Sequence, residues 1–279
     1  LLGNEDTMYL ALQKGDIDMV WSYSTGVAGT YQDVLAGDAN VSLINVAAAN
    51  APAVLAFNNA KGLFTNEDLR QAVSYALDYD AFRTYFGSTY AEIPNRGFVP
   101  ATTVGYKDTE KLTTDASKAD EYMKAAGYTE KNADGFYVNA DGQAAAFTLT
   151  VNAAKETHVG YAEMIKTQLE AFGIQVNLDT VDKDAYNAKT SNKFSENNIT
   201  MEAAFYGYTA AGMGMGKGLG SIYVDGNHAV QGDCQVFNEE FSAILREMKA
   251  AKTIEDYYTG AAKLQDYYAA HMPLIALYW

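Results

Sequence analysis

Segments with the apolar spacing of helices alternate with segments that have the spacing of strands along almost the whole chain. The clearest unit is a helix predicted over residues 159–172, between strands predicted over 147–151 and 174–181. Apolar residues occupy alternate positions in both strands and recur every three to four residues in the helix. Such a unit predicts two parallel strands joined by a right-handed crossover helix. The sequence therefore predicts an α/β fold.

The same spacing rules predict further elements on both sides of this unit. Helices are expected over 7–14, from Asn66 onward, from about 80, over 118–126, after Asp182, and over 237–250 and 253–270. Strands are expected over 17–22, 41–46, 53–57, 201–208 and 274–278, with a connection at 50–52. Residues 87–115 have the glycine and proline content of a long loop. Asn66 and Asp182 are expected to cap the helices that follow them.

Charge and hydrophobicity exclude several classes of protein. Asp and Glu outnumber Lys and Arg by 35 to 20, which gives a net charge of −15 and argues against nucleic-acid binding. No stretch reaches the roughly 18–20 apolar residues of a membrane span, because Asn50 and Pro52 interrupt the longest candidate. The first residues of this sequence do not have the pattern of a signal peptide. The chain starts without methionine and is expected to be a piece of a longer protein.

The residues that most often carry catalysis or metals are scattered. His158, His228 and His271 are too far apart for metal-ligand spacing, so each is expected to be a surface or cap residue. Cys234 is the single cysteine and is expected to be an incidental loop thiol. The nucleophile elbow of hydrolases and the zinc motif of metalloproteases are both missing from the sequence. No metal, no cofactor and no catalysis are therefore expected.

A glycine-rich run over residues 207–220 superficially resembles a phosphate-binding loop. Ala211 stands where that loop needs its first glycine, and Gly218 stands where it needs the Ser or Thr that holds magnesium. The run is therefore expected to be a mobile loop at the end of a strand. Most of the 21 tyrosines are expected to pack in the core, with a minority near this strand end facing a ligand.

Several stretches, in order along the chain, together resemble the extracytoplasmic solute-binding proteins of ABC importers, in the family that carries peptides and nickel. They are the segments Leu10-Ala-Leu-Gln-Lys-Gly-Asp-Ile-Asp18, Phe57-Asn58-Asn59 with residues 66–78, and residues 119–128, 141–151, 165–176 and 267–278. The resemblance spans nearly the whole chain. It implies a periplasmic-binding-protein-like lobe with a mixed sheet flanked by helices.

The resemblance also implies an organisation and a role. Residues 1–24 would end the preceding lobe, and residues 25–279 would form the C-terminal ligand-binding lobe. The protein would capture a peptide or similar small solute and deliver it to an ABC permease, without catalysis. It would be a monomer outside the cytoplasm, anchored to the membrane through a segment absent from this sequence. A receptor-like or chaperone module on the same fold, or an uncharacterised enzyme, are the alternatives.

Two motif positions and the ligand site complete the expectations. Arg70 is expected to be an exposed helix charge, and Asp78 a cap for the next helix. The sequence departs from the peptide-binding pattern after residue 208, where no acid occurs before Asp225 to hold an ammonium group, and Asn152 replaces the arginine of some dipeptide binders. A ligand should lie beyond the carboxyl ends of the strands. The candidate ligand-binding residues are Asn152, Lys155, Tyr206, Tyr208, Thr209 and Met213.

Overall fold

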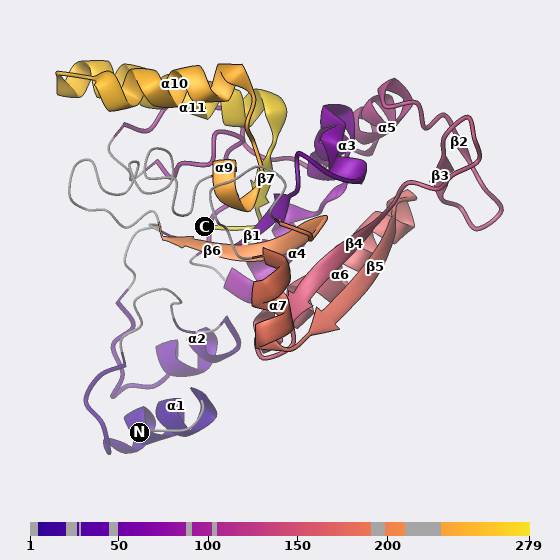
Figure 1. Ribbon diagram of the computed structural model, residues 1–279. Coiled ribbons are helices and arrows are strands. Elements are labelled where there is room, and N and C mark those ends of the chain that lie inside the picture. The colour runs from indigo at the N-terminus through magenta and orange to yellow at the C-terminus, as the bar shows by residue number, and fades with distance from the viewer. Residues whose placement is uncertain are drawn as a thin grey trace.

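The fold is built around one five-stranded mixed sheet (Figure 1). The computed structural model describes residues 5–20, 27, 29–44, 50–87, 91–101, 105–190, 199–209 and 230–279. In order across the sheet the strands are β5 (Gln175–Val181), β4 (Ala146–Asn152), β6 (Ala203–Thr209), β1 (Asn50–Phe57) and β7 (Leu274–Ala276). β5, β4 and β6 run parallel, while β1 is antiparallel to both β6 and β7. The predicted α/β class with a mixed sheet is confirmed.

Helices cover both faces of this sheet. On one face lie α3 (Glu67–Ala76) and α6 (Glu156–Phe172), with α5 (Ala116–Ala125) packed on α3. On the other lie α7 (Lys183–Thr190), α10 (Glu239–Ala250) and α11 (Ile254–His271). Strand β1 divides its side chains between the two cores, because Leu55 packs with α3 and α6 whereas Val54 packs with α10 and α11. This alternation is the period of two that a doubly covered strand requires.

The remaining elements surround the three layers. Helices α1 (Glu5–Lys14) and α2 (Gly29–Ala36) lie together at one end of the molecule (Figure 1). The others are the 3-10 turn η1 (Leu63–Thr65), α4 (Tyr79–Phe82), the turn of π-helix η2 (Arg83–Gly87), the ribbon strands β2 (Glu130–Lys131) and β3 (Tyr137–Val138), and α9 (Val230–Asp233).

Most predicted helices and strands are present, and so are their caps. Asn66 Oδ1 accepts a hydrogen bond from the amide of Asp68 at 2.9 Å, and Asp182 Oδ1 accepts from the amide of Asp184 at the same distance. Asp78 caps α4 by accepting from the amide of Ala81 at 3.0 Å, as expected. Side-chain capping of this kind depends on a few neighbouring residues, so local sequence predicts it well.

Three expectations about strands are wrong. The described parts of the segments predicted as strands, residues 17–20 and 41–44, have no strand pairing. The connection expected at 50–52 instead forms the start of β1. β1 has one more residue than β6 between Ala51 and Val54, and Pro52 lies in that bulge. Because proline has no amide hydrogen, a bulge is one of the few places where a strand accepts it.

The expectation that Arg70 is exposed is also wrong. Its side chain is buried and donates to the carbonyl oxygens of Phe64 at 2.7 Å and His271 at 2.9 Å. Gln71 and Arg96 donate to Ala270 and Ala269, the two residues before His271. These three side chains satisfy carbonyl groups that the last turn of α11 cannot pair within the helix.

Cys234 lies in a loop, as expected, but it is buried there rather than incidental to the packing. It follows α9 and is 0% exposed, and burial raises the pKa of its thiol well above the ordinary value. Its carbonyl oxygen accepts hydrogen bonds from both the backbone and the side-chain amide of Asn59, at 2.8 and 2.9 Å. The residue is therefore part of the packing between β1 and the segment after α9.

Candidate functional site

The carboxyl ends of the parallel strands meet at one edge of the sheet. β4 and β6 are parallel neighbours, with Leu149 opposite Ala203 and Thr150 opposite Ala204. The end of β4 at Asn152 and the end of β6 therefore lie at the same edge. β7 is antiparallel to β1, and β1 to β6, so β7 also ends there. In open α/β sheets this is the edge at which ligands bind. We call it the carboxyl edge.

A tight turn connects β4 to α6 at this edge. Asn152 is 6% exposed, its Oδ1 accepts from the amide of Ala154 at 3.0 Å, and its carbonyl oxygen accepts from the amide of Lys155 at 3.0 Å. Lys155 is exposed, occupies the N-cap position of α6, and makes no side-chain cap hydrogen bond. The first turn of this 17-residue helix thus offers amide groups, a helix dipole and an ammonium group to an anion.

The structure describes the other four predicted site residues to different extents. Tyr206 is half-buried, and its hydroxyl donates to the carbonyl oxygen of Thr190 at 2.9 Å, so the side chain is directed toward α7. Tyr208 and Thr209 lie in the last part of β6, where their backbones pair with Ala51 and Asn50 of β1; their side chains are outside what the structure describes. Met213 and the rest of the glycine-rich run from 210 lie outside the described residues. Of the six, Asn152 and Lys155 are brought together in one turn.

His158 is a residue of this region that sequence analysis missed. It was expected at the surface or in a cap, yet it is 6% exposed, and its ring lies 5.4 Å from that of Phe205 and 5.8 Å from that of Tyr161. Its Nδ1 is buried, and no hydrogen-bond partner for it is found among the described residues. Burial, assisted by the charge of Lys155, lowers the pKa of His158 to about 4. Lys155, three residues earlier, is exposed, so the two residues occupy different environments at the start of α6, and local spacing does not distinguish them.

Aromatic side chains form a firm support beside His158. The hydroxyl oxygens of Tyr161 and Tyr278 are 2.7 Å apart, and the ring of Phe86 packs edge-on against Tyr161 at 4.3 Å. Gly160 makes this approach possible, because a Cβ at that position would stand 3.2 Å from the Phe86 ring. The first two turns of α6 are thereby fixed against both η2 and the segment after β7.

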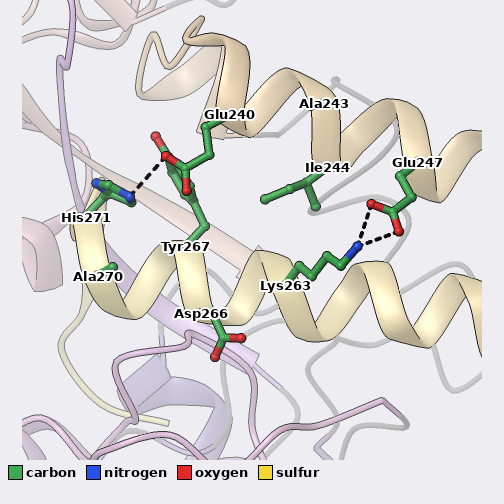
Figure 2. A pocket seen from close by; sticks show the side chains of 9 residues that line it. All are labelled: Glu240, Ala243, Ile244, Glu247, Lys263, Asp266, Tyr267, Ala270 and His271. Carbon is green, nitrogen blue, oxygen red and sulfur yellow. Dashed lines mark hydrogen bonds and ion pairs between the residues drawn. The ribbon is translucent and has the colours of Figure 1, made fainter.

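A concave surface lies between α10 and α11 (Figure 2). This groove of about 480 Å³ is lined by Glu240, Ala243, Ile244, Glu247, Lys263, Asp266, Tyr267, Ala270 and His271. Its ionisable side chains pair with one another and with neighbours: Lys263 with Glu247 at 2.6 Å, and His271 with Glu240 at 3.6 Å. Such paired, exposed charges stabilise the contact between the two helices, and we assign no ligand to this groove.

Two further findings concern metal ligands and membrane-spanning helices. The described part of the chain contains no group of three or more His, Cys, Asp or Glu side chains placed to hold a metal ion. Within the same residues, no helix combines the length and the apolar character needed to cross a membrane.

Comparison with known proteins gives the same picture for fold and family. In sequence, 158 residues are 26% identical to the "Probable ABC transporter-binding protein" of Deinococcus radiodurans, over 54% of this chain and 25% of that protein. The oligopeptide-binding protein AppA of Bacillus subtilis, solved with a nonapeptide, matches with a TM-score of 0.75 and 20% identity, over 98% of this chain and 52% of its own. NikA of Brucella suis, solved with Fe(III)-EDTA, matches with a TM-score of 0.81 and 15% identity, over 99% of this chain and 54% of its own.

The present chain therefore spans about half the length of these solved structures and a quarter of the curated relative. A family model described as "Bacterial extracellular solute-binding proteins, family 5 Middle" matches residues 2–218, which is most of the chain. The segments that resemble solute-binding proteins of ABC importers in the sequence lie in and beyond this range, and the fold agrees with them. The chain belongs to the family 5 bacterial extracellular solute-binding proteins.

Proposed function

We propose that these residues form the ligand-binding lobe of a solute-binding protein that captures a peptide or similar small solute and delivers it to an ABC permease. Family membership supports the transport role, and the geometry of the carboxyl edge supports the position of the ligand. The lobe binds and releases its ligand without chemical change. It acts as a monomer outside the cytoplasm, held at the membrane by a segment beyond the 279 residues.

The observation that carries the ligand site is the turn between β4 and α6. Asn152 closes this turn, and Lys155 stands exposed at the uncapped start of α6. A carboxylate or another acidic group of the ligand fits this position, because the helix dipole and the ammonium group both favour negative charge. The negative charge of Glu156, in the first helical turn, would oppose an anion at this position, so its side chain would turn outward when the ligand binds.

The proposed division of the protein rests on the family resemblance described above. We assign residues 1–24 to the crossover from a preceding lobe and residues 25–279 to this lobe. Large apolar side chains stay exposed on and beside α1 and α2: Leu10 is 49% exposed, Val34 55% and Ile44 83%. Exposed apolar side chains gathered at one end of a lobe are typical of a surface that another part of the protein covers.

An NMR titration of the 279-residue chain tests whether the turn at Lys155 binds an acidic group. N-acetylalanine and its uncharged analogue N-acetylalaninamide serve as probes, and the backbone amides of residues 153–158 report binding. The acid should bind at least three times more tightly than the amide, and Lys155→Ala should remove this preference. Lys252→Ala, which removes an exposed ammonium between α10 and α11, is the control and should leave the preference intact. Equal binding of acid and amide would remove the site from this turn.

A further inference from the structure

The turn η2 brings an exposed aromatic ring to the carboxyl edge. A Cβ added to Gly87 would stand 3.1 Å from the ring of Tyr278, so the end of η2 lies against the segment that follows β7. Because β7 ends at the carboxyl edge, η2 is at that edge too. Two residues before Gly87, Tyr85 is 68% exposed, whereas Tyr161 and Tyr278 nearby are 4% and 8% exposed.

Neighbouring aromatic side chains pack against the ring of Tyr85. It packs edge-on against Phe86, with the ring centres 4.8 Å apart and the planes at 71°. Phe86 is in turn fixed by Tyr161 at 4.3 Å, by the surface of Gly160, and by Phe82 at 6.4 Å. The Tyr85 ring thus belongs to a cluster of aromatic rings that continues into the core.

This cluster of rings also connects Tyr85 to the start of α6, where Lys155 would bind an acidic group. Gly160 and Tyr161 are in the second turn of α6, and Lys155 is the N-cap of the same helix. Five to six residues along a helix correspond to about 8–9 Å, so the support of Tyr85 is within one small-molecule length of Lys155. A ligand whose acidic group binds at the start of α6 would extend along the edge to reach the Tyr85 ring.

We propose that Tyr85 is a stacking wall of the ligand site, which accepts a flat ring of the ligand, either a sugar ring or an aromatic side chain. This proposal rests on the proposed function, because it assumes that the ligand lies at the carboxyl edge. Tyrosine suits such a role, since its ring provides a large contact area and loses little side-chain freedom on binding. The contact of the Tyr85 ring with Phe86 reduces this loss of side-chain freedom further.

The test uses the 279-residue chain with 13C-labelled tyrosine rings, and the Tyr85 signals are assigned from their loss in Tyr85→Phe. Three probes are titrated: N-acetyltryptophanamide for an aromatic side chain, methyl α-mannoside for a sugar ring, and N-acetylleucinamide for an apolar group without a flat face. At least one ring probe should shift the Tyr85 signals and bind about three to ten times more tightly than N-acetylleucinamide. The ring probe that does so identifies the source of the flat ring.

Variants then separate stacking from other causes. Tyr85→Ala should reduce the affinity of that ring probe to the level of N-acetylleucinamide, while Tyr85→Phe should retain most of it. Tyr128→Ala, a control between α5 and β2, should leave the affinity of that ring probe unchanged. If neither ring probe is preferred, or if Tyr85→Ala binds as the wild type does, the proposal is wrong. The preference of the chain for N-acetylalanine over its amide is measured in a separate titration. The Tyr85 proposal can therefore fail while the proposed function stands, and the proposed function can fail by its own titration.

Discussion

The buried imidazole of His158 should make the stability of the lobe depend on pH. Its ring packs against both Phe205 and Tyr161, and burial, with the nearby Lys155 charge, lowers its pKa from 6.5 to about 4. A histidine with a lowered pKa binds fewer protons in the folded chain than in the unfolded chain. Its contribution to stability is therefore complete above about pH 6.5, declines as the pH falls, and is exhausted near pH 4.

The magnitude follows from the two pKa values. A full shift of this size corresponds to about 3 kcal/mol, and about 2 kcal/mol of it should be lost between pH 7 and pH 5. Carboxylates also titrate in this range, so the wild type must be compared with a variant that lacks the imidazole. His158→Phe keeps an aromatic ring and cannot be protonated. The free energy of unfolding of the wild type minus that of the variant should fall by about 2 kcal/mol from pH 7 to pH 5.

Urea unfolding monitored by fluorescence at pH 7, 6 and 5 measures this difference. Tyr161→Phe is a suitable control, because it removes the hydrogen bond to Tyr278 next to the imidazole but leaves the histidine in place. It should be destabilised by about 1 kcal/mol at each pH and keep the pH dependence of the wild type. A difference between wild type and His158→Phe that stays constant within about 0.5 kcal/mol would refute the burial of a neutral imidazole.

Three further predictions, with one surface variant as a control, concern the packing of the lobe. Asn66→Ala removes the cap of α3 and should lower the free energy of unfolding by about 1 kcal/mol, measured by urea unfolding. Arg96→Ala should cost about 2–4 kcal/mol in the same assay, because Arg96 is buried and bonded to Ser74 Oγ at 3.2 Å. Lys249→Ala on the surface should leave stability within about 0.5 kcal/mol. Cys234, buried and with a raised pKa, should not react with a thiol-specific disulfide reagent at pH 8 until urea unfolds the chain, and rapid reaction of the native protein would contradict its burial.

Features determined by a few neighbouring residues could be predicted from sequence. The caps at Asn66 and Asp182 and the alternation of β4 belong to this kind. Each depends on residues within one or two helical turns. The strand–helix–strand pattern then determined the fold class, since parallel strands need a covering helix between them.

Features that depend on distant partners could not be predicted. Arg70 looks like a surface charge in its helix, but its acceptor on His271 is 201 residues away, and only the folded chain brings the two together. His158 is buried because Phe205 of β6 packs over it, which requires the register of β6 against β4. The direction of Tyr206 toward α7 depends on the same register. Local spacing carries no signal for any of these contacts.

The two sides of the first turn of α6 give a last prediction, because they couple ligand binding to the protonation of His158. Lys155 faces solvent at the start of the helix, and its positive charge is one cause of the lowered pKa of the buried imidazole. An anion bound at Lys155 would offset that charge, so the pKa of His158 should rise when an acidic ligand binds. By linkage, the acid should then bind more tightly as His158 becomes protonated. An NMR titration of the His158 ring, with and without N-acetylalanine, measures the change.

Lys155→Ala provides the matched control for this coupling. The substitution removes the charge itself, so the pKa of His158 should be higher than in the wild type before any ligand is added. N-acetylalanine should then have no further effect on it. A His158 titration that is the same in the wild type with the acid, the wild type without it and Lys155→Ala would show that the outer and inner sides of this turn act independently. The anion would then have to be placed elsewhere along the carboxyl edge.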